Sequence, residues 1–527
     1  MVMGLSLHLL LLCVHSVICS SGQTFPYVTS DVQEVSGRFF DYIVVGGGTA
    51  GCPLAATLSE KFSVLLVERG GSPYGDPFIL ESKYYGFSLL RTDEYTSAAQ
   101  SFVSKDGVSN FRGRVLGGSS AINGGFYGRA SKDFVKKVGW DNEEVRDAYE
   151  WVESRIISKP DHLTPWSHAA AFSFLEAGIF PYNGFSLEHI QGTKIVGSSF
   201  DNQGRRHLPA DLLQAGNPSK ITVLLNATVD KVIFQRTRTR DEKIAGGIRF
   251  IKSDGSSNQT YEAYLNQPDN SGSWGDVILA AGALGSPQIL LLSGIGPQQH
   301  LNNFEIPLLL NLKGVGEEMQ DNPAIAILVD SKPQNRTPEP AKVAGIADHF
   351  KIIIEAGIAP ISFNATIVRI TGKIAFPESV GKLELNSTDP RANPSVTFNY
   401  LSSEKDLAQC VKLTQLLELA LRSKSIASFL GSNEHRNKPM PTKDELQKLC
   451  KTTVRTFYHY HGGCTMGSVV DKNYRVYGVK GLRVIDGSTL LESPGTNPMA
   501  TLLMLGRYQG LKILKHRKGA SFNSPRT

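Results

Sequence analysis

The stretch from Asp41 to Gly70 constrains the fold more than any other part of this 527-residue chain. It reads DYIVVGGGTAGCPLAATLSEKFSVLLVERG, in which the apolar run Tyr42–Val45 predicts a short buried strand. A helical segment follows from about Ala50 to Glu60, and residues 63–67 predict a second strand. A strand, a glycine turn, a helix and a strand in this order predict a Rossmann-like unit that binds a dinucleotide.

Three glycines in this stretch, Gly46, Gly48 and Gly51, have the spacing G-x-G-x-x-G. Gly46 permits a tight turn, Gly48 lets the backbone approach a pyrophosphate, and Gly51 lets helix and strand pack closely. The helix N-terminus adds unpaired N–H groups and the positive end of a dipole. Glu68 ends the second strand, where a carboxylate can accept hydrogen bonds from ribose hydroxyls. An acid here favours FAD or NAD over NADP, and the unit alone does not separate FAD from NAD.

The length of 527 residues predicts two domains or one large composite. The net charge is +6, and the positive charges are scattered, with small clusters only at 236–240 and 515–518. This pattern is typical of a solvated basic surface, so we expect no nucleic-acid partner.

The N-terminus reads as a secretory signal over residues 1–21. An apolar run, Leu5–Val14, precedes several small residues, and it is too short to span a bilayer comfortably. No later stretch could span, so we expect a secreted protein or one in the endomembrane lumen. Five N-x-S/T sequons are candidate glycosylation sites: Asn226, Asn258, Asn335, Asn364 and Asn386.

The chain has six cysteines, of which Cys13 and Cys19 lie in the expected signal segment. Cys52 lies in the nucleotide-binding helix, and we expect it to be free, as we do Cys464, which lies in a glycine-rich motif. Cys410 and Cys450 then remain, and an oxidising compartment favours a disulfide between them. Two buried thiols are the alternative.

The rest of the chain alternates between glycine-rich loops and periodic segments. Residues 22–40 read as an exposed lead-in, and within the β-rich region 323–400 only Ala341–Ala359 is a candidate helix. Helices are expected at 143–157, 167–178, 403–430, 443–453 and 496–509, and strands at 221–225, 228–234 and the start of 274–296.

Several separate motifs together resemble the glucose-methanol-choline (GMC) family of FAD oxidoreductases. The loop Gly113–Tyr127 (GRVLGGSSAINGGFY) is similar to the first family signature, and Gly282–Gly296 (GALGSPQILLLSGIG) matches the second. The segment Tyr458–Gly467 (YHYHGGCTMG) and the Asn-Pro at 497–498 complete the pattern. Within the family, the chain looks most like the plant branch that holds HOTHEAD-type proteins and (R)-mandelonitrile lyases.

This resemblance implies FAD and an α/β architecture of two discontinuous domains. A Rossmann-like FAD-binding domain is expected from residues 36–150, 212–322 and 451–516. A substrate domain built on an antiparallel sheet flanked by helices is expected from 151–211 and 323–450, and a flexible tail from 517–527. Some family members tether the flavin to a histidine just before the loop asparagine. Ile122 stands there in this sequence, so we expect FAD to be bound non-covalently.

The family motifs also imply which residues line the FAD. Carried over position by position, they are Gly46, Gly48, Thr49, Ala50, Gly51, Glu68, Arg69, Val115, Ser119, Asn123, Gly124, Gly125, Phe126, Val229, Asp486, Gly487, Pro498 and Met499.

By the same resemblance, His459 and Asn497 are the catalytic pair beside the flavin. A neutral imidazole can accept the hydroxyl proton of an alcohol while hydride leaves the carbinol carbon for flavin N5. Asn497 can donate a hydrogen bond to the developing alkoxide. Phe457 and Tyr458 are assigned to the substrate pocket, and His461 to a structural role, with an exchange of the two histidine roles as the alternative.

Hydroxynitrile lyase is the main rival, because it shares this scaffold and keeps FAD without redox turnover. The sequence departs from the lyase pattern, which has a second histidine where Asn497 stands and a tyrosine where Phe457 stands. It also lacks the pocket cysteine expected after Asp321, since none appears before Cys410. We therefore expect an alcohol oxidoreductase, with a cyanohydrin lyase or a catalytically silent FAD-binding protein as alternatives.

Other chemistries find less support. His459 and His461 have a His-x-His spacing, but no cluster of His, Cys, Asp or Glu at ligand spacing accompanies them, so we expect no metal site. A hydrolase would need a nucleophile elbow, and no convincing one is present. We expect a monomer that acts on a small alcohol or cyanohydrin.

Overall fold

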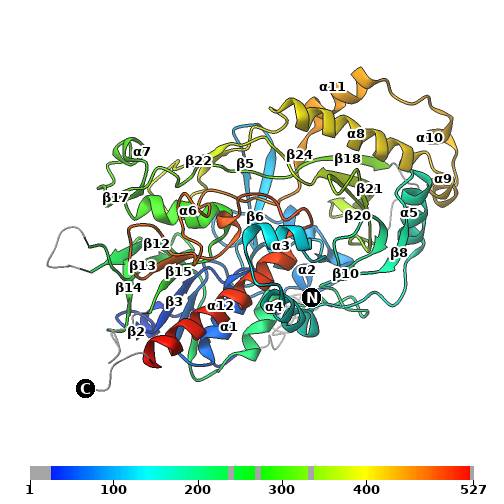
Figure 1. The fold of residues 1–527 in the computed structure, drawn as a ribbon. Coiled ribbons are helices and arrows are strands. Elements are labelled where there is room, and N and C mark those ends of the chain that lie inside the picture. The colour runs from blue at the N-terminus through cyan, green and yellow to red at the C-terminus, as the bar shows by residue number, and fades with distance from the viewer. Residues whose placement is uncertain (1–24, 236–241, 268–274, 330–336, 523–527) are drawn as a thin grey trace, which may run out of the picture.

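A six-stranded parallel sheet forms the centre of one half of the molecule (Figure 1). The computed structural model describes residues 25–235, 242–267, 275–329 and 337–522. The strand order is β1 (Val28–Thr29), β11 (Ile221–Leu224), β4 (Val64–Val67), β3 (Tyr42–Val45), β15 (Val277–Leu279) and β25 (Leu482–Val484). Strands that are distant in sequence thus meet in one sheet, as the discontinuous Rossmann-like prediction requires.

Both faces of this sheet are covered, and its central strands β4, β3 and β15 are apolar and buried at every position. Tyr42 and Val44 point toward helix α1 (Gly51–Ser59) and the C-terminal helix α12 (Pro498–Phe522). α12 packs closely on α1, since a Cβ on Gly506 would lie 2.2 Å from the Ala50 carbonyl oxygen. Helix α4 (Asn142–Ile156) lies beside α12 in the same layer.

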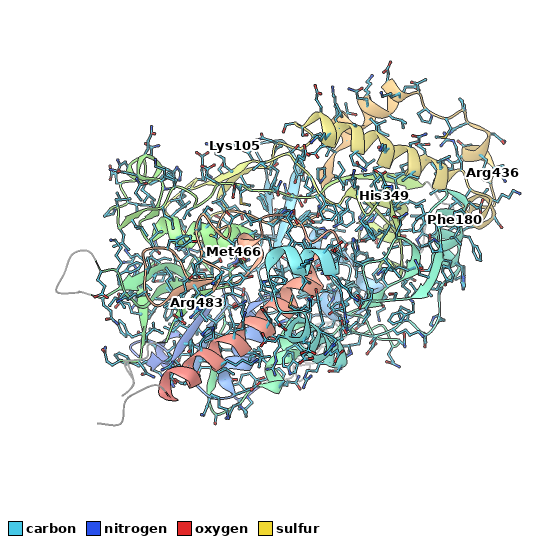
Figure 2. The ribbon with its side chains drawn as sticks, viewed as in Figure 1. Lys105, Phe180, His349, Arg436, Met466 and Arg483 are labelled. Atoms are coloured by element: carbon cyan, nitrogen blue, oxygen red, sulfur yellow. A yellow bond between two sulfur atoms is a disulfide. The ribbon has the colours of Figure 1, made fainter. Side chains whose placement is uncertain are left out.

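The opposite face of the parallel sheet packs against a smaller sheet and one helix. Ile43 and Val45 share a core with that sheet and with α6 (Gly282–Leu292). Side chains fill the space between these layers (Figure 2). The smaller sheet has the order β12 (Ala227–Phe234), β13 (Ala245–Lys252), β14 (Thr260–Leu265) and β2 (Phe39–Phe40).

A seven-stranded sheet forms the other half. Its order is β24 (Arg455–Thr456), β18 (Pro323–Val329), β21 (Ala365–Ile374), β20 (Ile352–Ser362), β19 (Val343–Ala347), β9 (Gly192–Ile195) and β8 (Tyr182–Phe185). All neighbours are antiparallel except β8 and β9. Helices that flank this sheet include α5 (Pro165–Glu176), α8 (Glu404–Leu421), α9 (Lys424–Leu430) and α11 (Lys443–Thr453). The predicted α/β fold with a substrate domain on a mainly antiparallel sheet is confirmed.

The remaining elements are short. The helices are α2 (Pro77–Leu80), α3 (Lys132–Val138), α7 (Gln298–Asn302) and α10 (Glu434–Asn437), with 3-10 turns at Val32–Glu34, Ser82–Tyr84, Phe87–Leu90, Gly118–Ala121, Pro209–Ala215 and Gly487–Thr489. The strands are β5 (Ala99–Val103), β6 (Ser109–Gly113), β7 (Phe126–Tyr127), β10 (Gly197–Ser198), β16 (Ile295–Gly296), β17 (Leu310–Asn311), β22 (Lys382–Glu384) and β23 (Ser395–Thr397).

The candidate helix Ala341–Ala359 is wrong. The segment forms two strands, β19 and the first part of β20, which pair with each other in register Ala344 to Glu355. A reversal at Asp348–Phe350, where three residues in succession have positive φ, separates the strands. The run of β-branched isoleucines that follows favours a strand between two neighbours over a helix.

Both ends of the described chain are more structured than the sequence suggested. The expected lead-in contributes β1 to the edge of the parallel sheet, and Val32 and Val35 are buried in the core. α12 continues to Phe522, into the region expected to be a flexible tail. Arg517 stacks on Phe62 at 4.4 Å from the ring centroid, which ties this part of α12 to the body of the protein.

The predicted disulfide is confirmed. Cys410 of α8 and Cys450 of α11 form it, while Cys52 and Cys464 are free and buried. The expected signal segment with Cys13 and Cys19, and the sequon at Asn335, lie outside the described residues. Among the helices that are described, none combines the length and the apolar character needed to cross a membrane.

Candidate active site

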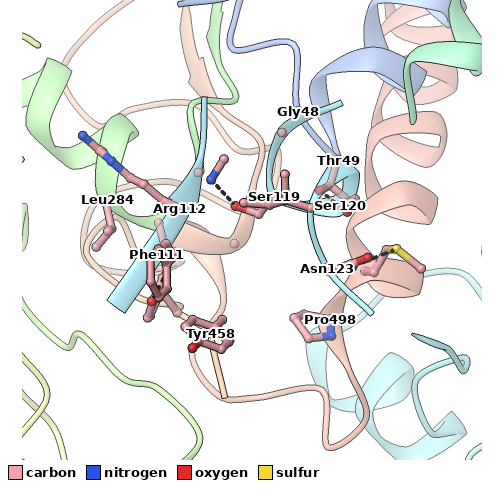
Figure 3. A pocket seen from close by; sticks show the side chains of 18 of the residues that line it. Gly48, Thr49, Phe111, Arg112, Ser119, Ser120, Asn123, Leu284, Tyr458 and Pro498 are labelled. Carbon is pink, nitrogen blue, oxygen red and sulfur yellow. Dashed lines mark hydrogen bonds between the residues drawn. The ribbon is translucent and has the colours of Figure 1, made fainter. Parts of the chain in front are cut away.

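One cavity of about 380 Å³ runs from the carboxyl ends of the parallel strands to the seven-stranded sheet. Gly46, Gly48 and Glu68 line it on the first side, and Glu355 and Arg369 line it on the second. Segments far apart in sequence converge around it (Figure 3). Ligands of open α/β sheets bind beyond the carboxyl ends of the strands, so this is where a dinucleotide is expected.

Two glycine turns meet at the inner end of the cavity. Gly46 has a φ of 105° and donates its N–H to the Val67 carbonyl at 2.8 Å. A Cβ on Gly51 would lie 1.9 Å from the Gly46 carbonyl oxygen, so only glycine allows this contact between turn and helix. Gly118 approaches Gly48 so closely that a Cβ on Gly118 would lie 2.7 Å from the Gly48 Cα. The backbone at Gly48 is thereby held at the cavity wall.

The N-terminus of α1 is available for an anion. No side chain caps it, whereas Ser131, Asp141 and Thr164 cap α3, α4 and α5. Arg69 and Arg112 also line the cavity and add positive charge near its inner end. Uncapped N–H groups and nearby guanidinium groups fit the two negative charges of a pyrophosphate.

Glu68 is fixed where β4 ends. Its two carboxylate oxygens accept from the backbone N–H groups of Gly47 at 2.9 Å and of Gly70 at 2.8 Å. Burial raises the pKa of Glu68. Each carboxylate oxygen has a second lone pair, so Glu68 can still accept from a ribose hydroxyl in the cavity.

The loop that follows β6 forms one wall of the cavity. Ser119 Oγ accepts from the Gly113 N–H at 3.0 Å, and the hydroxyls of Thr49 and Ser120 lie 2.7 Å apart (Figure 3). Asn123 Nδ2 donates to Met499 Sδ at 3.3 Å, which joins the loop to the start of α12. These contacts tie together three segments that the sequence motifs assign to the cofactor.

Arg206 is a buried support of this loop that the sequence reasoning missed. Its guanidinium donates to Asn123 Oδ1 at 3.0 Å and to the Asn123 carbonyl at 2.6 Å, and it stacks on Phe200. Burial lowers the pKa of Arg206 to about 9. No motif marks this residue, because its role depends on a long-range contact.

Most residues predicted to contact the cofactor line this cavity. Three of the predicted residues do not line it. Gly51 packs against the first glycine turn, Val115 is buried elsewhere, and Gly125 donates its N–H to Asn123 Oδ1. Those that do are Gly46, Gly48, Thr49, Ala50, Glu68, Arg69, Ser119, Asn123, Gly124, Phe126, Val229, Asp486, Gly487, Pro498 and Met499. The predicted His459, Asn497, Phe457 and Tyr458 line it too.

Replacing Gly48 with alanine tests the pyrophosphate site without breaking the fold. A Cβ at Gly48 would meet only Gly118 Cα, at an ordinary 3.7 Å, and would point along the cavity wall where a phosphate must approach. We expect native far-UV circular dichroism and an FAD affinity lower by about tenfold or more, a loss of roughly 1.4 kcal/mol. The measurement is titration of the apoprotein with FAD; unchanged affinity would contradict the assignment.

The imidazole of His459 has one nitrogen anchored and one directed at the cavity. Nδ1 lies 3.0 Å from Asn322 Oδ1. The Asn322 amide nitrogen donates to the carbonyls of Ile374 and Ala375, so its oxygen faces the ring and can accept from an Nδ1–H. Within the described residues, the ring makes its hydrogen bonds at Nδ1, which leaves Nε2 for a ligand; in the tautomer with the proton on Nδ1, Nε2 is a base.

Lys373 links the two members of the predicted catalytic pair. Its buried Nζ lies 3.1 Å from His459 Nδ1 and 3.2 Å from Asn322 Oδ1, and it donates to the Thr496 carbonyl at 3.0 Å. Thr496 directly precedes Asn497, so one amino group positions both segments. Burial lowers the pKa of His459 well below its usual range, and the nearby Lys373 charge lowers it further. The ring is therefore neutral at neutral pH.

A buried carboxylate fixes the backbone beside the histidine. Asp321 Oδ1 accepts from the His459 N–H at 2.8 Å, and its Oδ2 accepts from the Tyr400 hydroxyl at 2.6 Å. Burial raises the pKa of Asp321 to about 6. This anchor lies next to Tyr458, whose φ of 62° is unusual for a residue with a side chain and directs the chain into the cavity.

Asn497 directly precedes α12 and contacts a carboxylate of the other sheet. Burial raises the pKa of Glu355 to about 7, and the hydrogen bond from the Asn497 amide offsets part of this rise. Asn497 has two N–H donors, so one remains for a substrate oxygen. His461 does not line the cavity; its Nδ1 lies 2.9 Å from the His459 carbonyl, and burial lowers its pKa to about 4.

Asp486 is a buried carboxylate that lines the cavity at the start of α6. Asp486 accepts from the Gly282 N–H at 2.8 Å and from Ser286 and Ser488, so it holds the start of α6 at the cavity. Across the ranges that the structure describes, no group of three or more His, Cys, Asp and Glu residues is arranged to hold a metal ion.

The geometry fits a dinucleotide that carries a flat redox ring. The glycine turns, the uncapped helix and Glu68 suit the pyrophosphate and ribose, and the same cavity ends at a neutral histidine and an asparagine. An imidazole with a free nitrogen beside an amide donor can take a proton from a hydroxyl and stabilise the oxygen that loses it.

Comparisons with known proteins give a consistent result. The GMC oxidoreductase family matches residues 40–324 with its N-terminal model and 377–506 with its C-terminal model. The chain is 42% identical over 522 residues to "(R)-mandelonitrile lyase-like" of Arabidopsis thaliana, covering 93% of this chain and 92% of the relative. It is 40% identical over 511 residues to "Sinalpyl alcohol oxidase Nec3" of Nesocodon mauritianus, covering 91% and 90%.

A solved structure shows the same fold. Pyridoxine 4-oxidase from Mesorbium loti superposes with a TM-score of 0.77 at 20% sequence identity, covering 90% of this chain and 99% of that one. At this identity the likeness concerns the fold alone.

Proposed function

The chain belongs to the GMC oxidoreductase family, and from that premise we propose that it is an FAD-dependent oxidoreductase acting on the CH–OH group of an alcohol. The observation that carries the proposal is the neutral His459, with Nε2 free toward the cavity that begins at Gly46. Ile122 lines this cavity and offers no nucleophilic nitrogen, which supports non-covalent FAD. The enzyme works as a monomer in this proposal.

FAD supplies the two-electron acceptor when bound, taking hydride at N5. His459 Nε2 accepts the hydroxyl proton of the alcohol, and the Nδ1–H bond to Asn322 keeps the ring in the tautomer that can do so. The second N–H of Asn497 donates to the substrate oxygen as negative charge develops on it. Phe457 and Tyr458 supply apolar and aromatic surface that holds the substrate body and excludes water.

Anaerobic mixing with a panel of primary alcohols tests this function. We expect at least one alcohol to bleach the flavin absorbance of the holoenzyme in a single turnover, because electrons leave the carbinol carbon for the cofactor. Bound FAD that no alcohol reduces, without any cyanohydrin cleavage, would contradict the proposal and support a catalytically silent role.

A cyanohydrin lyase is the second candidate. The relative named "(R)-mandelonitrile lyase-like" favours it, and His459 would be its acid–base group too. The residues around the cavity favour it less, since Asn497 replaces a second histidine, Phe457 replaces a tyrosine, and none of the described residues lining the cavity is a cysteine. Cyanide release from mandelonitrile without flavin bleaching would establish the lyase.

The site of action in this proposal is an extracytoplasmic, oxidising compartment. The Cys410–Cys450 disulfide supports it, as such bonds persist in oxidising environments. Asn226, Asn258, Asn364 and Asn386 are all exposed, as a glycan acceptor must be. Expression of the full chain in a secreting cell, followed by glycosidase treatment and mass measurement, tests secretion and glycosylation together.

A further inference from the structure

A row of polar side chains crosses the face of the seven-stranded sheet that is turned toward the active site. Alternate residues of β20 and β21, such as Ile354 and Ile370, pack against the helices. The residues between them, Glu355, Arg369 and Thr371, point to the other face and line the cavity. Polar residues on the inner face of a sheet need partners, so this row indicates a polar ligand.

Two atoms of the row have no partner of their own. Glu355 Oε1 and Thr371 Oγ1 are both buried, and neither has a hydrogen-bond partner among the described residues. The two residues stand directly opposite each other in the register of β20 and β21. A buried polar group without a partner is energetically unfavourable, so a pair of them in one cavity calls for an explanation.

Their neighbours are already engaged. Lys373 Nζ already makes hydrogen-bond contacts with His459 Nδ1, Asn322 Oδ1 and the Thr496 carbonyl. Arg369 Nη2 donates to the Tyr85 hydroxyl at 2.9 Å. The proton transfer derived for His459 and Asn497 requires neither Glu355 Oε1 nor Thr371 Oγ1. The two atoms are therefore available to recognise a part of the substrate that does not react.

The chemistry of the two groups defines that part. A carboxylate oxygen accepts a hydrogen bond, and a threonine hydroxyl can donate one. Side chains opposite each other on neighbouring strands have Cβ atoms about 4.5–5.5 Å apart, so one small group can reach both. A hydroxyl group satisfies the two at once, because it donates to Glu355 Oε1 and accepts from Thr371 Oγ1.

The surrounding wall defines the rest of the ligand. Leu89, Phe111, Phe457 and Ala341 line the same cavity and present apolar surface. An apolar body thus fits between this wall and the polar row. Both features line the cavity that contains His459, and the rings of Phe457 and His459 lie 4.9 Å apart.

We propose that Glu355 and Thr371 recognise a second hydroxyl group on the substrate, so that the preferred substrates are alcohols with an apolar body and another hydroxyl besides the one that is oxidised. The proposal rests on the alcohol oxidoreductase function above. It names two specificity residues that lie outside every sequence motif.

Matched substrate pairs test it. Benzyl alcohol is compared with its 2-, 3- and 4-hydroxy derivatives, and butan-1-ol and hexan-1-ol with butane-1,4-diol and hexane-1,6-diol, by the second-order rate of anaerobic flavin reduction. We expect one hydroxylated partner to react about 10² times faster or more, because a site built to bind a hydroxyl rejects the analogue that lacks it.

Variants connect this preference to the two residues. Thr371→Val removes the hydroxyl at nearly constant volume and should reduce the ratio to about threefold or less, as should Glu355→Met, which removes the acceptor oxygen, whereas Thr371→Ser keeps the hydroxyl and should keep the ratio. Ratios near one in the wild type, or a ratio that survives both Thr371→Val and Glu355→Met, would overturn the proposal while leaving alcohol oxidation intact.

A binding measurement covers the case in which no alcohol reduces the flavin. Benzaldehyde and the hydroxybenzaldehydes are titrated into the holoenzyme and followed by the flavin difference spectrum, which needs no turnover. Tighter binding of one hydroxybenzaldehyde by about tenfold, lost in Thr371→Val and kept in Thr371→Ser, would support the hydroxyl site even though the oxidoreductase function failed. Equal affinities would overturn it.

Discussion

His459→Ala is expected to keep FAD bound and to slow alcohol-driven flavin reduction by about 10² or more. The imidazole provides the free Nε2 that faces the cavity, and no other neutral base is placed by hydrogen bonds in the same way among the described lining residues. FAD should remain, because the glycine turns, α1 and Glu68 that suit it belong to another part of the cavity. The measurement is the anaerobic reduction rate together with the flavin-to-protein ratio.

His168→Ala is the matched control, since His168 is exposed on α5 and does not line the cavity. It should leave the reduction rate within about twofold, as exposed substitutions away from a site have small effects. Unchanged reduction in His459→Ala, combined with a large loss in His461→Gln, would reverse the roles assigned to the two histidines.

Lys373→Met is expected to slow reduction by about 10- to 100-fold, because small misplacements of catalytic groups have effects of this size. The variant removes the amino group that contacts His459 Nδ1, Asn322 Oδ1 and the carbonyl before Asn497. Methionine keeps most of the length and the apolar stem, so the packing between β21 and its neighbours is largely preserved. Lys351→Met, at an exposed position just before β20, is the matched control.

The pH dependence separates this electrostatic role from simple loss of structure. The charge of Lys373 helps to lower the pKa of His459, so its removal raises that pKa. His459 acts as a base only when neutral, and the rate therefore falls as the pH drops through its pKa. The acid limb of the reduction rate should move to higher pH in Lys373→Met. If Lys373→Met is slower but the acid limb of its reduction rate stays at the wild-type pH, Lys373 acts only through packing.

The nucleotide-binding half could be predicted from the sequence because its signals are local. Tyr42–Val45 and the helix after it appear in the structure almost as predicted, since strand, turn and helix follow one another within a few residues. The glycine spacing fixes backbone conformations at the turn itself, as the φ of 105° at Gly46 shows. Local patterns of this kind do not depend on partners elsewhere in the chain.

The substrate half could not be predicted to the same depth. Ala341–Ala359 is the one candidate helix of its region, and periodicity alone does not separate a buried helix from buried strands. β19 pairs with β9, which lies far earlier in the sequence, while β20 pairs with β19 before it and with β21 directly after it. The lead-in and the end of α12 show the same limit, as their order comes from long-range packing.

The supports of the catalytic pair were missed for a related reason. Lys373 lies 86 residues before His459, and Glu355 meets Asn497 only after the two halves of the molecule assemble. A lysine or glutamate in a strand carries no motif. The one available signal was the alternation of charged residues with isoleucines in β20 and β21, which indicates a sheet face turned toward something polar.

The most direct test of the account uses a primary alcohol that reduces the flavin, prepared with deuterium at both carbinol positions. In the proposed mechanism the carbinol carbon loses its hydrogen as hydride while His459 takes the hydroxyl proton. We therefore expect slower single-turnover reduction with the deuterated alcohol than with the ordinary one. Equal single-turnover reduction rates for the deuterated and the ordinary alcohol would contradict the account.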